Sequence, residues 1–86
     1  MNIHVSNLSM NLIDTDLRKM FSAFGEVITA VIIRDKINGR SRGTAFVDMI
    51  NDKQAAQAIF VLDKSLVDGK RISVSEIEYS PSRYKN

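Results

Sequence analysis

Residues 42–49 read RGTAFVDM, and this stretch decides the fold. Its side chains alternate with the two-residue period of a β-strand that is buried on one face. Three of them are predicted to face a core: Ala45, Val47 and Met49. The side chains between them then point to the opposite face: Thr44, Phe46 and Asp48. The strand is predicted over residues 44–49, with Arg42 just before it.

Three other segments have the composition of strands. Residues 2–6 alternate in the same way, and residues 26–34 are rich in β-branched side chains. Asn38-Gly39 predicts a turn after the second of these segments, because this dipeptide is frequent in hairpins. A last strand is predicted over residues 70–77.

Two segments have the spacing of amphipathic helices. The first begins at Ile13 or Asp14 and stops at Gly25, a residue that often ends helices. Its apolar side chains recur at i, i+3, i+4 and i+7: Leu17, Met20, Phe21 and Phe24. The second begins after Asn51, which can cap it, and Gln54 stands where a capping box requires it. Its predicted buried stripe is Ala55, Ala58, Ile59 and Leu62.

The order of elements is therefore β-α-β-β-α-β. Two interleaved right-handed βαβ units predict an α+β, ferredoxin-like sandwich with one antiparallel four-stranded sheet. Both helices should cover the same face, because two helices cannot bury both faces of four strands. We expect a domain over residues 1–78 and a flexible basic tail over 79–86. The uncovered sheet face is the first place to look for function.

Composition limits the classes of function. The chain has 86 residues, enough for one domain, and 44% of them are hydrophobic. It has no cysteine, which excludes disulfides and thiolate metal sites. It contains no apolar run near the roughly 20 residues that span a bilayer, and its start lacks the features of a secretory signal. A cytoplasmic location without cofactor or membrane contact is the default expectation.

Charge is distributed unevenly along the chain. The net charge is only +2, although the isoelectric point is about 9.2. Four cations fall in one short stretch with a single acid, Asp35: Arg34, Lys36, Arg40 and Arg42. Most acids lie outside this stretch, and five of them lie in or beside the predicted helices: Asp14, Asp16, Asp52, Asp63 and Asp68. One end of the domain should therefore be positive.

Residues 3–8, IHVSNL, and residues 42–49 together resemble the two short motifs of the RNA-recognition motif family. The spacers around them, such as Phe24-Gly25, also resemble the family pattern, and the likeness extends from Asn2 to about Glu78. The one-domain form resembles small single-motif RNA-binding proteins of bacteria. The resemblance implies a non-catalytic domain that binds single-stranded RNA on the open face of its sheet.

In this family, aromatic side chains on the two middle strands stack on bases. This chain departs from the pattern at two of three positions. His4 has a smaller ring that can still stack, Thr44 has no ring, and Phe46 keeps the usual aromatic ring. The resemblance thus implies a platform of two rings. Since each stacked ring contributes about 1–3 kcal/mol, the loss of one should weaken binding tenfold or more.

Other residues should surround the rings. Val31 and Ile33 are expected to face outward, and the cations to contact phosphates. Asp48 could accept from a base amine or pair with Lys70 or Arg71. The residues expected to contact RNA are His4, Asn7, Val31, Ile33, Arg34, Lys36, Arg40, Arg42, Thr44, Phe46, Asp48 and Tyr79.

Each of these features also has an ordinary structural explanation. A lone histidine is often a satisfied structural residue, a charged loop is often only solvated, and Tyr79 could belong to a tail without a ligand. Phe60 and Val61 fall off the helical stripe, so they either tuck against residues 66–67 or contact a protein.

Three functions follow from these patterns. The first is weak, sequence-tolerant binding of single-stranded RNA, as a chaperone or post-transcriptional regulator, with some tolerance of single-stranded DNA. The second is a protein-interaction module; a monomer is expected, but the apolar sheet face could support a homodimer. The third is an enzyme like the ferredoxin-like acylphosphatases, which we set aside because residues 6–11 contain no glycine or arginine to cradle a phosphate.

Overall fold

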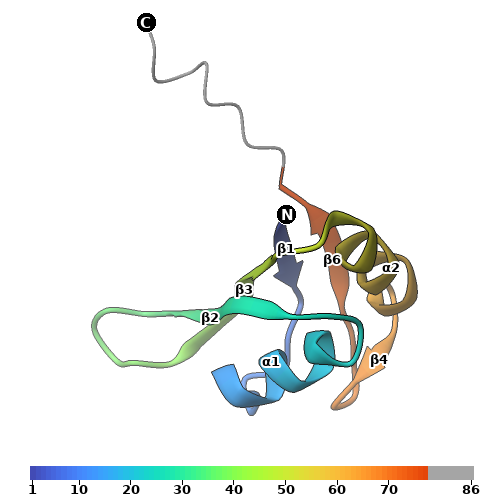
Figure 1. The fold of residues 1–86 in the computed structure, drawn as a ribbon. Coiled ribbons are helices and arrows are strands. Elements are labelled where there is room, and N and C mark those ends of the chain that lie inside the picture. The colour runs from blue at the N-terminus through green and yellow to red at the C-terminus, as the bar shows by residue number, and fades with distance from the viewer. Residues whose placement is uncertain (78–86) are drawn as a thin grey trace, which may run out of the picture.

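The structure is a computed structural model that describes residues 1–77. Eight elements follow one another along this part of the chain (Figure 1). They are β1 (Asn2–Ser6), α1 (Asp14–Ser22), β2 (Val27–Arg34), β3 (Ser41–Met49), α2 (Asp52–Leu62), β4 (Leu66–Val67), β5 (Lys70–Arg71) and β6 (Ser73–Glu76). The predicted β-α-β-β-α-β order is confirmed, with a short hairpin of β4 and β5 added before the last strand.

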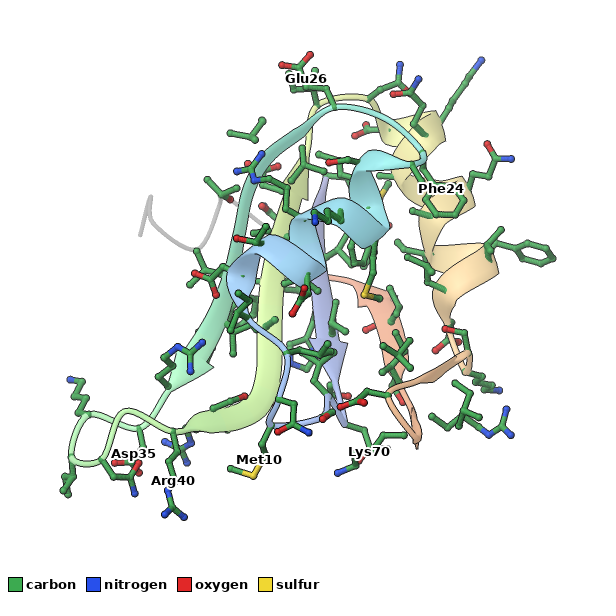
Figure 2. The ribbon with its side chains drawn as sticks, turned by 90° about the horizontal axis from the view of Figure 1, so that it is seen from below. Met10, Phe24, Glu26, Asp35, Arg40 and Lys70 are labelled. Atoms are coloured by element: carbon green, nitrogen blue, oxygen red, sulfur yellow. The ribbon has the colours of Figure 1, made fainter. Side chains whose placement is uncertain are left out.

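The main sheet has the strand order β2-β3-β1-β6, and its neighbours pair antiparallel. Both helices lie on the same side of this sheet (Figures 1 and 2). This is the ferredoxin-like arrangement that the sequence predicts. It places β1 and β3 in the middle of the sheet, and among residues 1–77 no helix covers the other face.

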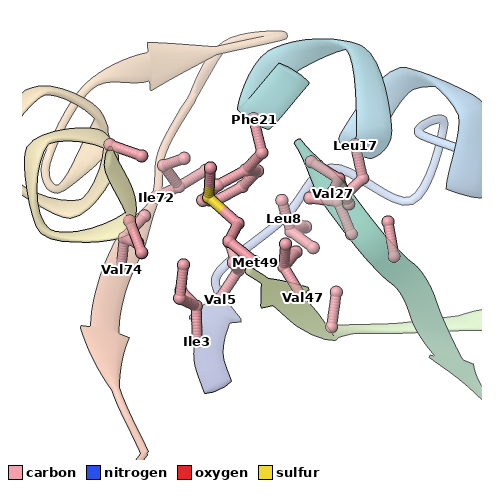
Figure 3. Close-up of a cluster of buried hydrophobic side chains, with 14 of the residues drawn as sticks. Ile3, Val5, Leu8, Leu17, Phe21, Val27, Val47, Met49, Ile72 and Val74 are labelled. Carbon is pink, nitrogen blue, oxygen red and sulfur yellow. The ribbon is translucent and has the colours of Figure 1, made fainter. Parts of the chain in front are cut away.

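The core lies between the sheet and the two helices. Figure 3 shows apolar side chains from α1 and from the strands meeting in one cluster. The predicted inward residues of β3 are at most 1% exposed: Ala45, Val47 and Met49. Leu17 and Phe21 of α1 are fully buried, as are Ala55 and Ala58 of α2. Because every second side chain of β3 is buried in the core, the side chains between them must face the open side of the sheet.

The helix ends partly follow the predictions. The Asn51 side chain accepts a hydrogen bond from the Gln54 backbone N–H (2.9 Å), which caps α2. The Gln54 side chain does not complete a capping box but lies against Gly25, where an added Cβ would collide with the Gln54 amide oxygen. α1 ends at Ser22 rather than at Gly25, and Phe24 follows it in a turn, half-buried against the core.

Strand β2 is an edge strand, and α1 covers its free edge. Asp14 accepts a hydrogen bond from the Ile32 backbone N–H (3.0 Å). Arg18 donates to the carbonyl oxygens of Val27 and Ile28 at 2.9 and 3.2 Å. These side chains occupy backbone groups that would otherwise be free to pair with a strand of another molecule.

Two strand predictions need correction. β3 begins at Ser41, so Arg42 lies within the strand rather than in the loop before it. The predicted strand over residues 70–77 is divided at the fully buried Ile72. There the chain pairs with the segment after α2. The Ile72 N–H donates to the Ser65 carbonyl oxygen (2.9 Å), and the Ile72 carbonyl oxygen accepts from the Lys64 N–H (2.7 Å). Only β6 then joins the main sheet.

The prediction that Phe60 and Val61 tuck against residues 66–67 is wrong. Phe60 is 87% exposed and Val61 51% exposed on the outer side of α2. Phe60 follows the buried Ala58 by two residues, which is about 200° around an α-helix, so its ring points away from the sheet.

Some expectations fall partly or wholly outside the described residues. Tyr79 and the expected tail over residues 79–86 lie there, and so does the expected domain boundary at residue 78. Within residues 1–77, none of the helices combines the length and the apolar character needed to cross a membrane. The same residues contain no group of three or more side chains arranged to hold a metal ion.

Candidate nucleic-acid interface

The open face carries one row of side chains that crosses all four strands of the main sheet. Val31 of β2 lies opposite Phe46 of β3. Phe46 lies opposite His4 of β1, and His4 opposite Ser75 of β6. These four residues are called the central row below. An apolar side chain and two rings therefore stand next to one another on the side without helices.

The two rings of the central row are in contact. The centroids of His4 and Phe46 are 5.4 Å apart, and the ring planes are tilted by 44°. This is within the range of favourable aromatic pairs. Phe46 is 43% exposed and His4 is half-buried, so both present surface to solvent. A flat ligand group can stack on either ring without displacing a core side chain.

Aliphatic side chains extend the apolar surface toward β2. Val31 is 47% exposed, and Ile33 is half-buried. Both point away from the core, as the sequence predicts, because Ala30 and Ile32 fill the inward positions at 7% and 3% exposure. The result is a contiguous apolar strip from Ile33 and Val31 to Phe46.

Asp48 lies at one end of β3, and the predicted pairing with Lys70 or Arg71 is wrong. Its carboxylate is 3.7 Å from the amino group of Met1, which also lies 3.3 Å from Asp52. Lys70 and Arg71 lie at the opposite end of the sheet, because the strands next to β1 run antiparallel to it. Antiparallel register therefore excludes the pairing that charge alone suggested.

Asn7 and Thr44 lie at the other end of the sheet. The Asn7 side chain donates to the Arg71 carbonyl oxygen (2.8 Å), and its backbone has a positive φ of 59°. Next to it, the Leu8 N–H bonds the Gly43 carbonyl (3.0 Å) and fastens the loop after β1 to β3. Thr44 is half-buried at the position where the resemblance implies a missing ring.

The loop between β2 and β3 is ordered by its own hydrogen bonds. The Asp35 side chain accepts from the backbone N–H groups of Ile37 and Asn38 (2.8 and 3.3 Å). Figure 2 shows Asp35 and Arg40 on this loop, which extends from the sheet. All four cations are exposed, and none is in a salt bridge within residues 1–77: Arg34, Lys36, Arg40 and Arg42.

Comparisons with known proteins agree with this geometry. The profile of the RNA recognition motif family matches residues 3–73. The chain belongs to the RNA recognition motif family. The chloroplastic RNA-binding protein CP29B of Arabidopsis thaliana is 40% identical over 94% of this chain. The present chain spans only 28% of that relative, and 29% of the 28 kDa chloroplastic ribonucleoprotein of Nicotiana sylvestris, to which it is 37% identical over 94% of its own length.

Solved RNA recognition motifs have the same fold. The RNA-binding protein PG1 matches with a TM-score of 0.89 and 36% identity, over 94% of this chain and 98% of that chain. The Sxl-lethal protein/RNA complex matches with a TM-score of 0.84 and 33% identity, over 88% and 47% of the two chains. The curated relatives named here are plant proteins, so the likeness to small bacterial proteins stays a prediction.

Several open-face residues of this RNA recognition motif were missed by the sequence argument. Ser75 completes the central row, and Thr29 and Asn2 flank Asp48 on the neighbouring strands. The alternation of residues 2–6 already places Asn2 on the same side as His4. Thr29 was harder to find, because a register shift between Val27 and Thr29 interrupts the period of β2.

Proposed function

We propose that this domain binds single-stranded RNA on the open face of its sheet, without catalysis. The central row is the observation that carries the proposal, because two touching rings and an exposed valine lie on the face that the helices leave free. Bases would stack on Phe46 and His4, since every base has a flat face that an aromatic ring can contact. The relatives named as RNA-binding proteins support this function.

The cations supply the second part of the proposal. Three of the cations lie at the end of β2 or in the loop that follows it: Arg34, Lys36 and Arg40. Arg42 lies in β3, two positions before Thr44. Exposed cations without carboxylate partners can contact phosphates, which position the strand but do not read its sequence. Val31 and Ile33 would pack against sugars or bases, and Asn7, Thr44 and Asp48 would offer hydrogen bonds at the two ends of the sheet.

The proposed affinity is low. Two stacked bases contribute about 2–6 kcal/mol together, whereas association costs on the order of 4–15 kcal/mol in lost freedom. Phosphate contacts must supply the difference, so binding should be micromolar or weaker and should depend on salt. Permissive binding of this kind suits an RNA chaperone or a post-transcriptional regulator in the cytoplasm, and it should tolerate single-stranded DNA.

Fluorescence anisotropy with a labelled single-stranded RNA and its duplex form tests this proposal. We expect the single strand to bind more tightly, because bases within a duplex are already stacked and cannot reach the rings. Affinity should fall as salt rises, with a slope of about −0.7 per phosphate contacted, on logarithmic axes. Equal binding of both forms, or no binding at low salt, would contradict the proposal.

A second function is favoured by Phe60. A ring that is 87% exposed on α2, on the side away from the central row, is the kind of side chain that protein interfaces bury. A protein-interaction module, self-association included, is therefore the alternative. Light scattering of the wild type and of Phe60→Asp tests self-association. A wild-type dimer that the substitution dissociates would support self-association through Phe60, and a monomeric mass for both proteins would contradict it.

A further inference from the structure

A pocket lies at the end of the sheet beside Thr44. It has a volume of about 430 Å³ and is formed by the loop after β1, the beginning of β3 and the beginning of β5. Asn7 and Met10 line it from the loop, Arg42 and Thr44 from β3, and Lys70 from β5. Figure 2 shows Met10 and Lys70 at this same end of the molecule. The volume is in the range of about 300–1,000 Å³ that is common for small-ligand pockets.

Hydrogen bonds to backbone carbonyl groups hold the walls of this pocket. The Leu8 N–H bonds the Gly43 carbonyl, and the Asn7 side chain ties the same loop to β5 through the Arg71 carbonyl (3.0 and 2.8 Å). Asn7 keeps a φ of 59°, which asparagine tolerates better than most residues but which still costs conformational energy. The pocket is therefore preformed, and a ligand would not have to order the loop first.

The lining combines positive charge with an exposed apolar side chain. Arg42 and Lys70 approach the pocket from different strands, and neither is in a salt bridge within residues 1–77. Met10 is 59% exposed, although a flexible, polarisable thioether would normally fill a gap in a core. A matching ligand has an anionic group and, next to it, a flat group with an apolar face. A nucleotide has both.

The pocket is also placed where an RNA strand on the central row would arrive. Thr44 belongs to its lining and is two residues from Phe46 along β3, which is about 7 Å in an extended strand. One nucleotide of a splayed strand can cross this distance. We propose that the pocket holds the next nucleotide of the bound RNA, with its phosphate between Arg42 and Lys70 and its base against Met10.

This inference rests on the proposed RNA binding and adds a site to it. Thr44 cannot stack a base, so a strand that continues past Phe46 has no ring to contact at that position. In place of a ring, the Met10 thioether and the cations Arg42 and Lys70 of the pocket contact the next nucleotide. The pocket makes the domain sensitive to the length of the RNA, because a short oligonucleotide that covers only His4 and Phe46 does not reach it.

Binding of a dinucleotide and of a tetranucleotide RNA to the wild type, Met10→Ala and Lys70→Gln tests the inference. Both side chains are exposed, so both variants should fold. We expect each variant to bind the tetranucleotide about threefold to tenfold more weakly, with unchanged dinucleotide affinity. Lys70→Gln should also reduce the salt slope for the tetranucleotide by about 0.7. Val61→Ala and Lys53→Gln on α2 are the matched controls and should bind like the wild type.

The possible outcomes are distinguishable. Absence of any RNA binding by the wild type refutes the proposed function itself. Wild-type binding to the tetranucleotide that both variants retain in full overturns the pocket and leaves the function standing. An equal loss for the dinucleotide and the tetranucleotide also overturns it, because the two side chains would then act on the platform rather than on a further nucleotide.

Discussion

Replacement of Phe46 by alanine removes the larger ring of the central row. Phe46 is 43% exposed and contacts His4 at a centroid distance of 5.4 Å. Loss of one stacked base costs about 1–3 kcal/mol, which corresponds to roughly fivefold to 150-fold weaker binding at about 1.4 kcal/mol per factor of ten. A fully buried phenylalanine would cost about 3–5 kcal/mol of stability. Because Phe46 lies outside the core, we expect roughly half of that.

Fluorescence anisotropy with a single-stranded RNA measures the effect, and thermal unfolding shows that the variant is folded at the assay temperature. Phe60→Ala is the matched control, since it removes the same type of side chain from an 87% exposed position on α2. Phe46→Tyr should restore binding because it keeps the ring. Affinity of Phe46→Ala within twofold of the wild type, or an equal loss in Phe60→Ala, would refute the stacking argument.

Three further predictions concern a glycine of β3, acid stability and self-association. Gly43→Ala should lower the free energy of unfolding by about 1–2 kcal/mol in urea titrations, because Gly43 has a φ of +77° and an added Cβ would lie 3.3 Å from the Leu8 carbonyl oxygen; an unchanged midpoint would disprove this. The pKa of the Asp68 carboxyl is lowered, mainly by a hydrogen bond from the Ser9 side chain and to a smaller extent by one from the Asn11 side chain. The stabilisation that this carboxylate provides is therefore present above its unfolded pKa of about 3.9 and is lost as the pH falls through the lower folded value. The difference in unfolding free energy between the wild type and Asp68→Asn should shrink over that acid range, and a constant difference would contradict the assignment. Val31→Asp should weaken RNA binding, because it places a negative charge in the central row, and it should leave a monomeric mass in light scattering unchanged; a dimer that it dissociates would instead support self-association through the sheet.

The sequence predicts the parts of the fold that depend on a regular period. Alternation in residues 44–49 is enough to place Phe46 outside the core, and the same argument places His4 beside it once the strand order is known. Both rings are close in space although 42 positions separate them, since the antiparallel register of β1 and β3 brings them together. Local pattern and family topology were sufficient here.

Other features depend on contacts that no local pattern contains. The chain divides the last predicted strand at Ile72 because the segment after α2 competes for its backbone hydrogen bonds. Asp48 lies near the amino group of Met1 because the register of β1 and β3 places the beginning of β1 beside the end of β3. The pocket near Met10 required three segments to be placed together, so residue spacing could not indicate it.

Backbone amide shifts during titration of the labelled protein with short single-stranded RNA test the central claim most directly. We expect the largest shifts at His4, Phe46, Thr44 and Arg42. These shifts should shrink as salt rises, and the amides of α2 should change little. Shifts confined to the helices, or none at low ionic strength, would contradict RNA binding on the open sheet face.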